Sequence, residues 1–485
     1  MSKFVQGLNW TVIQQVAYFV ANYVSLILLA KYLRPEDFGI VAVSTVLVGL
    51  FDILNGFGIP QLVIKNHVSD EKQLGHYYGK CLLLSAGLAV ACIFGGQIYV
   101  LWYQSDIRQD VVLIISVSSL GLILNSTVAF YNALYQRVLD FKMPALYYTI
   151  GLFAGNVLAV IYASMKGGYW SLVLRNLATP AFVVLGFTLF SRFRIVPHLR
   201  SRLGDDERSF TFWLSSNQVL NYLSRNLDYL IIGRFFDVGV VGQYSIAYKI
   251  MLLPMKFLSS RIQSVLYPTL ARMQDSTKAL VNFYVKVVSF IGFISFPLMA
   301  LASVTAPLWV PLLFDSERYV DLIHLIQWLT IAGAFQAVTA PIGSLYLVNN
   351  LVRQMAIYSI ISAIAFTVGY LLGVWSGNIV TFAIIYTIMS IIVNFFVANH
   401  VPLSHLGYSL RIFLKKTLPP ILPVMVAYLF VQFFLWSWEA EKHVNRLLAL
   451  ATLGIVFVLT YLIAYALLFR PDLHRKLSKL KTLYS

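Results

Sequence analysis

Long apolar stretches follow one another along almost the whole chain, and short segments rich in charged residues, Gly or Pro separate them. A helix needs about 20 mainly apolar residues to cross the hydrocarbon core of a bilayer. Fourteen stretches approach this length, so the pattern predicts fourteen transmembrane helices. The predicted helices cover residues 8–29, 38–59, 77–101, 110–134, 144–165, 169–190, 210–232, 240–263, 281–304, 320–345, 355–375, 378–399, 418–438 and 446–469.

Composition supports a membrane protein and excludes a soluble multidomain protein. Of the 485 residues, 59% are hydrophobic and only 12% are charged, whereas a globular domain carries about 25% charged residues. Sharing the chain among fourteen helices leaves too few residues for a water-soluble domain of ordinary size. The predicted fold class is therefore all-α, a polytopic membrane protein.

The net charge of +16 would suggest nucleic acid binding in a soluble protein. In the predicted layout, however, the number of Lys and Arg residues alternates between high and low from one loop to the next. Loops on the side of the N-terminus carry 23 of the 36 cations, the opposite loops carry 8, and five fall within helices. Because cytoplasmic loops are enriched in Lys and Arg, this asymmetry predicts that both termini are cytoplasmic and that no nucleic acid partner is needed.

The most polar connection in the chain reads SRFRIVPHLRSRLGDDER and separates two sets of six predicted helices. It suggests an N-terminal lobe at 1–190, a basic cytoplasmic linker at 191–209 and a C-terminal lobe at 210–400. Residues 401–485 then hold helices 13 and 14 and a basic cytoplasmic tail.

A weak internal repeat relates the two lobes. Shifting the chain by 203 residues without a gap aligns similar residues of the first two helices with the seventh and eighth. The matched pairs are Trp10 with Trp213, Gln15 with Gln218, Val16 with Val219, Lys31 with Arg234, Tyr32 with Phe235 and Gly39 with Gly242. Since six helices separate the copies, both have the same orientation, which predicts a parallel pseudo-twofold along the membrane normal. Some alternating-access transporters use this arrangement, with the substrate between the repeats.

Charged residues within the predicted helices are candidates for function, because an ionisable group in a bilayer is costly unless it faces a cavity or a partner. The seventh helix contains SSNQVLNYLSRNLD, in which Arg225 and Asp228 are three residues apart and can pair on one face. The alternative is an ion pair that only locks the repeat interface.

The eighth helix places Lys249, Lys256 and Gln263 at heptad spacing, in one column of an α-helix. Pro254 lies between the two lysines and should bend the helix. Snorkelling explains Arg261, near the cytoplasmic end, but explains Lys249 poorly. The pattern therefore favours a water-filled lumen lined by Lys249 and Lys256.

The first lobe adds two embedded charges, Asp52 and Arg175. The embedded groups together are net positive, which suits an anionic cargo such as a diphosphate. Asp52 and Asp228 are the embedded carboxylates and hence the candidates for ion coupling, the alternative being satisfied counter-ions. No nucleotide-binding loop, metal motif or nucleophile motif occurs, so no catalytic residue, metal or cofactor is predicted, and the chain is not expected to be an enzyme.

Several segments together resemble a known family. The first hairpin, LAKYLRPEDFGIVAVSTVLVGLFDILNGFGIPQLVIK, is followed by GQYSIAYKIMLLPMKFLSSRIQSVLYPTLARMQDSTKALVNFYVK and by APIGSLYLVNN. These segments look like the polysaccharide transport family of the multidrug/oligosaccharidyl-lipid/polysaccharide (MOP) exporter superfamily, and most closely its Wzx-type branch with the colanic acid exporters. Members have two six-helix lobes plus an extra C-terminal pair, which agrees with the layout above.

The resemblance implies a flippase of the bacterial inner membrane that moves polyprenyl-diphosphate-linked oligosaccharide repeat units for exopolysaccharide, capsule or O-antigen assembly. It implies alternating access driven by an ion gradient or the membrane potential. Membrane lipids, and the polymerase and export machinery of the same pathway, would be its further partners. The substrate-binding roles would fall to Arg225, Lys249, Lys256 and Arg175, and coupling to Asp228 and Asp52. The alternatives are a multidrug antiporter of the same superfamily and a membrane-embedded glycan polymerase or ligase.

Overall fold

A computed structural model gives the structure of the protein, and every regular element in the part it describes is helical. Contacts divide the chain into two compact units, residues 1–242 and residues 243–485. The lobe boundaries expected at 190, 209 and 400 remain predictions. The described residues are 3–55, 59–65, 71–102, 108–138, 140–198, 219, 222, 226–315, 317–439 and 446–469.

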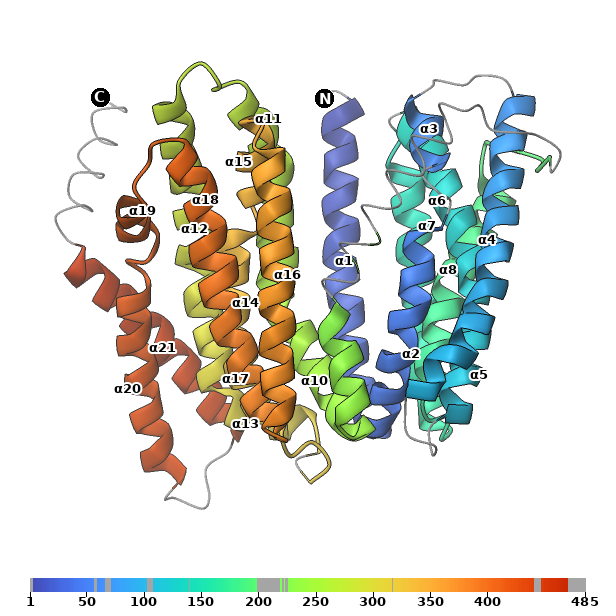
Figure 1. The fold of residues 1–485 in the computed structure, drawn as a ribbon. Coiled ribbons are helices and arrows are strands. Elements are labelled where there is room, and N and C mark those ends of the chain that lie inside the picture. Colours follow the sequence, from blue (N-terminus) through green and yellow to red (C-terminus); the bar gives the residue numbers. More distant parts are fainter. Residues whose placement is uncertain are drawn as a thin grey trace. The chain divides into compact units, whose positions relative to one another are not determined.

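Long helices make up the N-terminal unit and run along one common direction (Figure 1). The closest packed pairs are α7 with α8, α1 with α7, and α4 with α6. Residues 226–235 are also helical. The elements are α1 (Lys3–Tyr32), α2 (Pro35–Ile53), α3 (Ile59–Lys65), α4 (Glu71–Tyr99), the 3₁₀ turn η1 (Val100–Trp102), α5 (Arg108–Ser118), α6 (Leu120–Arg137), α7 (Lys142–Ser164) and α8 (Trp170–Phe190); α10 (Val238–Met251) starts in this unit.

The C-terminal unit continues from α10 and packs α12 against α14, α16 against α17, and α20 against α21. Its core joins buried residues of α12, α14 and the last two helices, such as Tyr284 and Phe457. The elements after α10 are the π-helix η3 (Met255–Ser259), α11 (Ser260–Ala271), α12 (Thr277–Val304), α13 (Ala306–Leu313), α14 (Leu322–Thr339), α15 (Ile342–Val348), α16 (Val352–Trp375), α17 (Ile379–Met389), the π-helix η4 (Ser390–Val397), α18 (Ala398–His405), α19 (Leu410–Thr417), α20 (Ile421–Glu439) and α21 (Arg446–Leu468).

The helices confirm the predicted class and most predicted spans. Among the described residues, ten helices are long and apolar enough to cross a membrane, or eleven if the bent pair of α19 and α20 counts as one span. The chain is a multi-pass membrane protein. Helices α1 and α2 overlap the first two predicted spans, 8–29 and 38–59, but are not among the ten helices that pass this test. Most of the seventh predicted span, 210–232, lies outside the described residues. The total of fourteen therefore stays a prediction.

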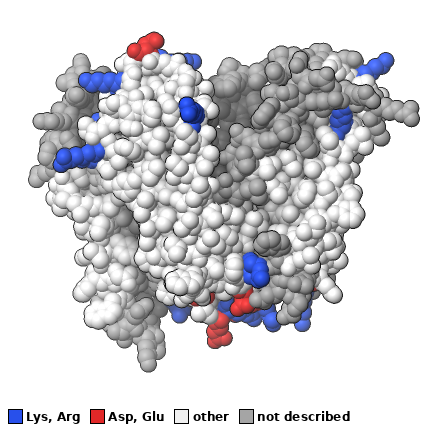
Figure 2. Space-filling model, in the orientation of Figure 1, with Lys and Arg blue, Asp and Glu red and all other residues white. Residues whose placement is uncertain are grey.

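Large apolar side chains point outward along several helices. On α16, Ile360, Ile364 and Leu371 are 62%, 60% and 52% exposed, and their spacing of four and seven residues places them on one helix face. Such a stripe suits lipid tails. On the face shown in Figure 2, charged side chains lie toward the ends of the helices and the band between them is white.

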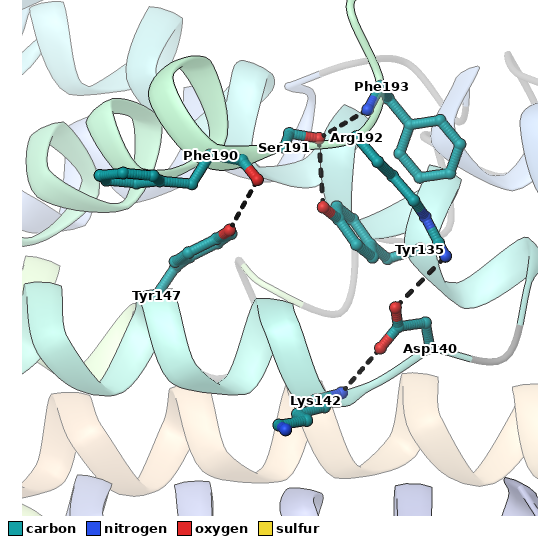
Figure 3. Close-up of polar contacts among 8 residues, drawn as sticks. All are labelled: Tyr135, Asp140, Lys142, Tyr147, Phe190, Ser191, Arg192 and Phe193. Carbon is teal, nitrogen blue, oxygen red and sulfur yellow. Dashed lines mark hydrogen bonds and ion pairs between the residues drawn. The ribbon is translucent and has the colours of Figure 1, made fainter.

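Polar contacts fasten the end of α8 to its neighbours in the N-terminal unit (Figure 3). The Tyr147 hydroxyl donates to the carbonyl of Phe190 at 3.1 Å, and the Tyr135 hydroxyl donates to Oγ of Ser191 at 3.2 Å. Arg192 then forms an ion pair with Asp140 at 3.2 Å. These contacts fix the path of the chain as it leaves α8 and enters the predicted linker.

The start of α2 follows from its sequence. Pro35 occupies the first helical turn, where its missing N–H is not needed. The carboxylate of Asp37 accepts a hydrogen bond from the backbone N–H of Arg34 at 2.8 Å, which satisfies a donor at the helix end.

Two glycines let the N-termini of α2 and α10 touch. A Cβ atom on Gly39 would collide with the carbonyl of Val238, and a Cβ atom on Gly242 would collide with the carbonyl of Pro35. The shift of 203 residues that aligns Gly39 with Gly242 also aligns Pro35 with Val238. The contact is therefore made twice by equivalent residues, which supports the internal repeat.

Prolines and π-helical turns interrupt the helices of the C-terminal unit. The α-helix α10 ends at Met251, and the π-helix η3 follows directly after Pro254. Pro lacks an N–H and clashes with the preceding turn, so it removes a hydrogen bond and weakens the α-helix at its position. A π-helical segment thus follows Pro254, where the sequence predicts a bend, and the bend itself stays a prediction.

We expect Gly39→Ala and Gly242→Ala each to destabilise the protein by about 1–3 kcal/mol, because the new methyl group forces the two helices apart. Thermal unfolding of the purified protein in detergent measures the effect. Gly87→Ala is the matched control, since no atom beyond its chain neighbours and its own helix backbone lies within 4 Å of its Cβ position. Equal melting temperatures for all three variants would contradict the tight contact.

Candidate functional site

A cavity of about 360 Å³ lies among helices α1, α6, α7 and α8 of the N-terminal unit. A second hollow of about 210 Å³ shares Tyr18 and Tyr148 with it and adds Gln14 and Gln15. The polar lining of the larger cavity comes from all four helices. The main polar residues of the larger cavity are Tyr18, Asn22, Asn125, Tyr148, Arg175 and Asn176.

Close packing of α7 on α8 positions the wall that carries Arg175. Gly151 and Gly155 are four residues apart on α7 and lie against α8, where a Cβ atom on either would clash with Thr179. This small-xxx-small spacing allows two membrane helices to approach closely. Thr179 lines the cavity as well, and its hydroxyl donates to the carbonyl of Arg175 at 3.0 Å.

Arg175 has no carboxylate partner among the described residues. Its side chain is half-buried and lines the cavity. An unpaired guanidinium away from bulk water is costly. An anion entering the cavity would remove this cost and accept hydrogen bonds from the planar guanidinium.

Asp52 lies on α2 and is held by neutral amides. Its Oδ1 accepts hydrogen bonds from Nδ2 of Asn125 at 3.1 Å and from Nδ2 of Asn55 at 3.3 Å. Asn55 also donates to the carbonyl of Leu122 at 2.6 Å and accepts from the Ser85 hydroxyl at 2.7 Å. Within the described ranges no Lys or Arg forms an ion pair with Asp52. A carboxylate without a cationic partner is costly wherever water is excluded.

Asn125 connects these two predicted residues. It lines the cavity together with Arg175 and donates to Asp52. The structure thus brings Arg175 and Asp52 into one polar system of the N-terminal unit. Reasoning from charges alone missed Asn22, Asn125 and Asn176, although an amide inside an apolar span was a signal that could have revealed them.

Asp228 is also in the N-terminal unit and is 1% exposed. Its Oδ1 accepts a hydrogen bond from the backbone N–H of Tyr229 at 2.9 Å. Arg225, its expected partner, lies outside the described residues, so their pairing stays a prediction. Nearby in sequence, the Tyr222 hydroxyl donates to the carbonyl of Val46 at 2.9 Å, which places the Tyr222 side chain against α2.

Lys249 and Lys256 lie in the C-terminal unit, on opposite sides of the break at Pro254. Lys249 is half-buried near the end of α10, and Lys256 is exposed within η3. The expected column with Gln263 assumed a regular α-helix, and a π-helical turn changes the angle between successive residues. Gln263 instead donates to the carbonyl of Ala340 at 3.2 Å, so its amide group stabilises the packing of α11 near the end of α14.

A family model and several known proteins are similar to this sequence. The profile of the family described as "Polysaccharide biosynthesis protein" matches residues 28–324. The lipopolysaccharide biosynthesis protein WzxC of Escherichia coli K12 is 30% identical over 353 residues, covering 71% of this chain and 69% of WzxC. The succinoglycan biosynthesis transport protein ExoT of Rhizobium meliloti is 26% identical over 281 residues, covering 55% of this chain and 54% of ExoT.

Solved structures show the same fold at low sequence identity. The lipid II flippase MurJ in an inward closed conformation superposes with a TM-score of 0.74 at 14% identity, covering 97% of this chain and 100% of MurJ. An inward-facing multidrug resistance MATE family transporter of the MOP superfamily gives a TM-score of 0.62 at 16% identity, covering 81% and 95%. The chain therefore belongs to the polysaccharide biosynthesis protein family and has the fold of the MOP superfamily, as its sequence segments indicated.

Proposed function

We propose that the protein is a flippase that moves a polyprenyl-diphosphate-linked oligosaccharide repeat unit across the bacterial inner membrane, for exopolysaccharide, capsule or O-antigen assembly. Its relatives are named for lipopolysaccharide biosynthesis and succinoglycan transport, and its fold is shared with a lipid II flippase. The observation that carries the proposal is Arg175, a half-buried cation without a carboxylate partner in the described residues, which lines a polar cavity.

In this proposal the diphosphate and its first sugars enter the cavity of the N-terminal unit. The guanidinium of Arg175 donates to phosphate oxygens through its planar fork. The amides of Asn22, Asn125 and Asn176 hydrogen-bond to sugar hydroxyls, while Tyr18 and Tyr148 offer aromatic faces and hydroxyls. The lipid tail remains in the bilayer, because burying it in a polar cavity would be unfavourable.

Further cations would then bind the cargo. Lys249 and Lys256 of the C-terminal unit are two candidates, and Arg225, which lies outside the described residues, is the third. A half-buried lysine on a membrane helix is costly unless it faces water or an anion. We propose that these residues bind the diphosphate in turn during alternating access.

Coupling to an ion gradient or to the membrane potential is assigned to Asp52, with Asp228 as the second carboxylate. Asp52 accepts hydrogen bonds from two amides and forms no ion pair with a described cation. Binding a proton or a cation there would remove an unfavourable charge. Because Asn125 touches both Asp52 and the cavity, a change in the charge of Asp52 alters the hydrogen bonds available to the cargo.

Both termini are proposed to be cytoplasmic, on the basis of the 23 to 8 distribution of Lys and Arg between the two sets of loops. The proposed lobes are 1–190 and 210–400, joined by the linker 191–209 and followed by the region 401–485. Membrane lipids surround the protein, and the polymerase and export machinery of the same pathway are its proposed partners.

A multidrug antiporter is the rival function, since a MATE family transporter has the same fold. The cationic cavity favours an anionic cargo over the organic cations that a drug exporter would carry.

One experiment separates the flippase from the multidrug antiporter. In cells that lack this protein, lipid-linked repeat units should accumulate and stay hidden from a periplasmic probe that cannot cross the inner membrane. Exposed but unpolymerised units would point to the glycan polymerase or ligase, and changed drug tolerance with normal glycan export would support the antiporter.

We expect Arg175→Gln to lower glycan export by about tenfold to a hundredfold, because it removes charge-assisted hydrogen bonds to the diphosphate. Arg175→Lys should keep the charge and restore part of the export, measured as surface polysaccharide per membrane-inserted protein. Arg194→Gln, at an exposed position of the same unit, is the matched control. Export by Arg175→Gln equal to that of the control would remove Arg175 from the binding site.

Asp52→Asn should preserve folding while making transport insensitive to the driving ion. An amide has nearly the same shape as the carboxylate and still accepts a hydrogen bond from Asn125, but it cannot bind a proton or balance a cation. Transport in proteoliposomes with and without an imposed proton gradient, repeated with a sodium gradient, measures the effect. Asp275→Asn, at an exposed position, serves as the control, and a gradient response retained by Asp52→Asn would assign coupling elsewhere.

Lys249→Ala is expected to abolish export without loss of protein from the membrane, because it removes a half-buried cation from the proposed path. The measurement pairs surface glycan with quantitative detection of the protein in isolated membranes. Lys31→Ala, at an exposed site at the end of α1, provides a control of the same chemistry. Normal glycan output from Lys249→Ala would exclude this residue from cargo binding.

A further inference from the structure

Helix α19 (Leu410–Thr417) is a short amphipathic helix between two apolar elements of the C-terminal unit. Phe413 and Thr417 are fully buried, whereas Arg411 and Lys415 are exposed and Ile412, between them in the sequence, is 46% exposed. At 100° per residue the buried side chains share one face and the cations lie on the opposite side. Two prolines, Pro419 and Pro420, follow and prevent a regular helix from continuing.

Side-chain contacts fix α19 against α12, beside which it lies (Figure 1). The hydroxyl of Ser289 donates to the carbonyl of Lys416 at 2.9 Å. The ammonium group of Lys416 donates to Oδ1 of Asn282 at 3.2 Å and to the hydroxyl of Tyr408 at 3.0 Å. The orientation of the cationic face is therefore set by the fold.

Helix α12 adds two cations beside this face. Lys278 and Lys286 are exposed and are spaced four residues to either side of Asn282. Residues four apart on a helix share a face, so both lysines belong to the stripe of α12 that meets α19. We call Lys278, Lys286, Arg411, Lys415 and Lys416 the α19–α12 cluster.

Acidic residues do not balance this cluster. Among the described residues, Lys278, Lys286, Arg411 and Lys415 form no ion pair. The sequence has no Asp or Glu between residues 322 and 438, and none within α12. The acid closest in sequence is Asp275, an exposed residue before the start of α12. Five positive charges are thus held close together, and their mutual repulsion favours a bound anion.

The geometry of the chain places the cluster at a membrane surface. Helices α19 and α20 meet at a bend of 43°. Helix α20 is strongly apolar, and Leu429 on it is 65% exposed, as suits a helix surrounded by lipid tails. A short helix that carries cations and an exposed aliphatic residue, attached at an angle to a spanning helix, has the form of an interfacial helix.

We propose that the α19–α12 cluster binds the headgroups of anionic phospholipids of the surrounding bilayer. The phosphates accept hydrogen bonds from Arg411, Lys415 and Lys286, while Ile412 inserts among the first methylene groups of the acyl chains. Basic juxtamembrane groups bind anionic lipid headgroups in this way, and Arg and Lys at the interface keep their charged ends among the headgroups. Bound lipid would hold α19 at the membrane surface and so fix the angle at which α20 enters the bilayer.

The test uses the full-length protein in detergent, titrated with dioleoylphosphatidylglycerol or dioleoylphosphatidylcholine and analysed by native mass spectrometry. We expect the phosphatidylglycerol to bind preferentially, and Arg411→Gln/Lys415→Gln to weaken its binding about 30-fold, the usual effect of removing two juxtamembrane cations. Arg353→Gln/Arg446→Gln removes the same charge from exposed positions outside the cluster and should leave binding unchanged. High salt should weaken binding to the unaltered protein.

Three results would overturn the proposal. They are equal binding of the two lipids, equal weakening by the two double variants, and specific binding of undecaprenyl diphosphate at the cluster that phosphatidylglycerol does not displace. The last result would mark a docking site for the diphosphate of a cargo. Because the assay does not measure transport, its outcome is independent of the proposed flippase activity.

Discussion

The cost of placing a charged group away from water governs the arrangement of the N-terminal unit. A carboxylate or guanidinium in such a place needs a partner inside the protein or in a water-filled cavity. Asp52 is held by two amides, and one of them, Asn55, also bonds to Leu122 and Ser85. Arg175 lines a cavity without a carboxylate partner among the described residues. The network around Asp52 makes that site rigid, while the cavity leaves Arg175 available to an anion.

Close helix packing makes this polar system possible. Apolar side chains gain little from contact with one another when the alternative is contact with lipid, so membrane helices associate through small residues and polar groups. Gly151 and Gly155 bring α7 onto α8 and thereby set the wall that carries Arg175. Gly39 and Gly242 allow the N-termini of α2 and α10 to touch through backbone atoms. The second contact is made by residues related by the 203-residue shift, so the repeat in the sequence corresponds to a repeat in packing.

The relatives indicate the process in which the protein acts, whereas the cavity indicates the chemistry of its cargo. The family match places the protein in polysaccharide biosynthesis, and the relatives WzxC and ExoT are named for lipopolysaccharide biosynthesis and succinoglycan transport. Solved structures with the same fold include both a lipid II flippase and a MATE family transporter, so fold alone does not define the cargo. The chemistry of the cavity makes that distinction in our proposal, because a guanidinium surrounded by amides and tyrosines complements an anionic, hydroxyl-rich cargo.

Much of the architecture was predictable because bilayer thickness imposes a nearly constant length on every spanning helix. Helix α8, for example, was expected at 169–190 and is found at Trp170–Phe190. The sequence also identified Arg175 and Asp52, since charges inside apolar spans are conspicuous. It did not reveal that Asn125 both lines the cavity with Arg175 and donates to Asp52, or that Lys256 lies within a π-helical segment. Periodicity within one helix reports which residues share a face, whereas contacts between helices depend on packing between distant segments. The length, order and membrane character of the helices were therefore determined by the sequence pattern, and only the tertiary structure decided which side chains line the cavity with Arg175 and which amides hold Asp52.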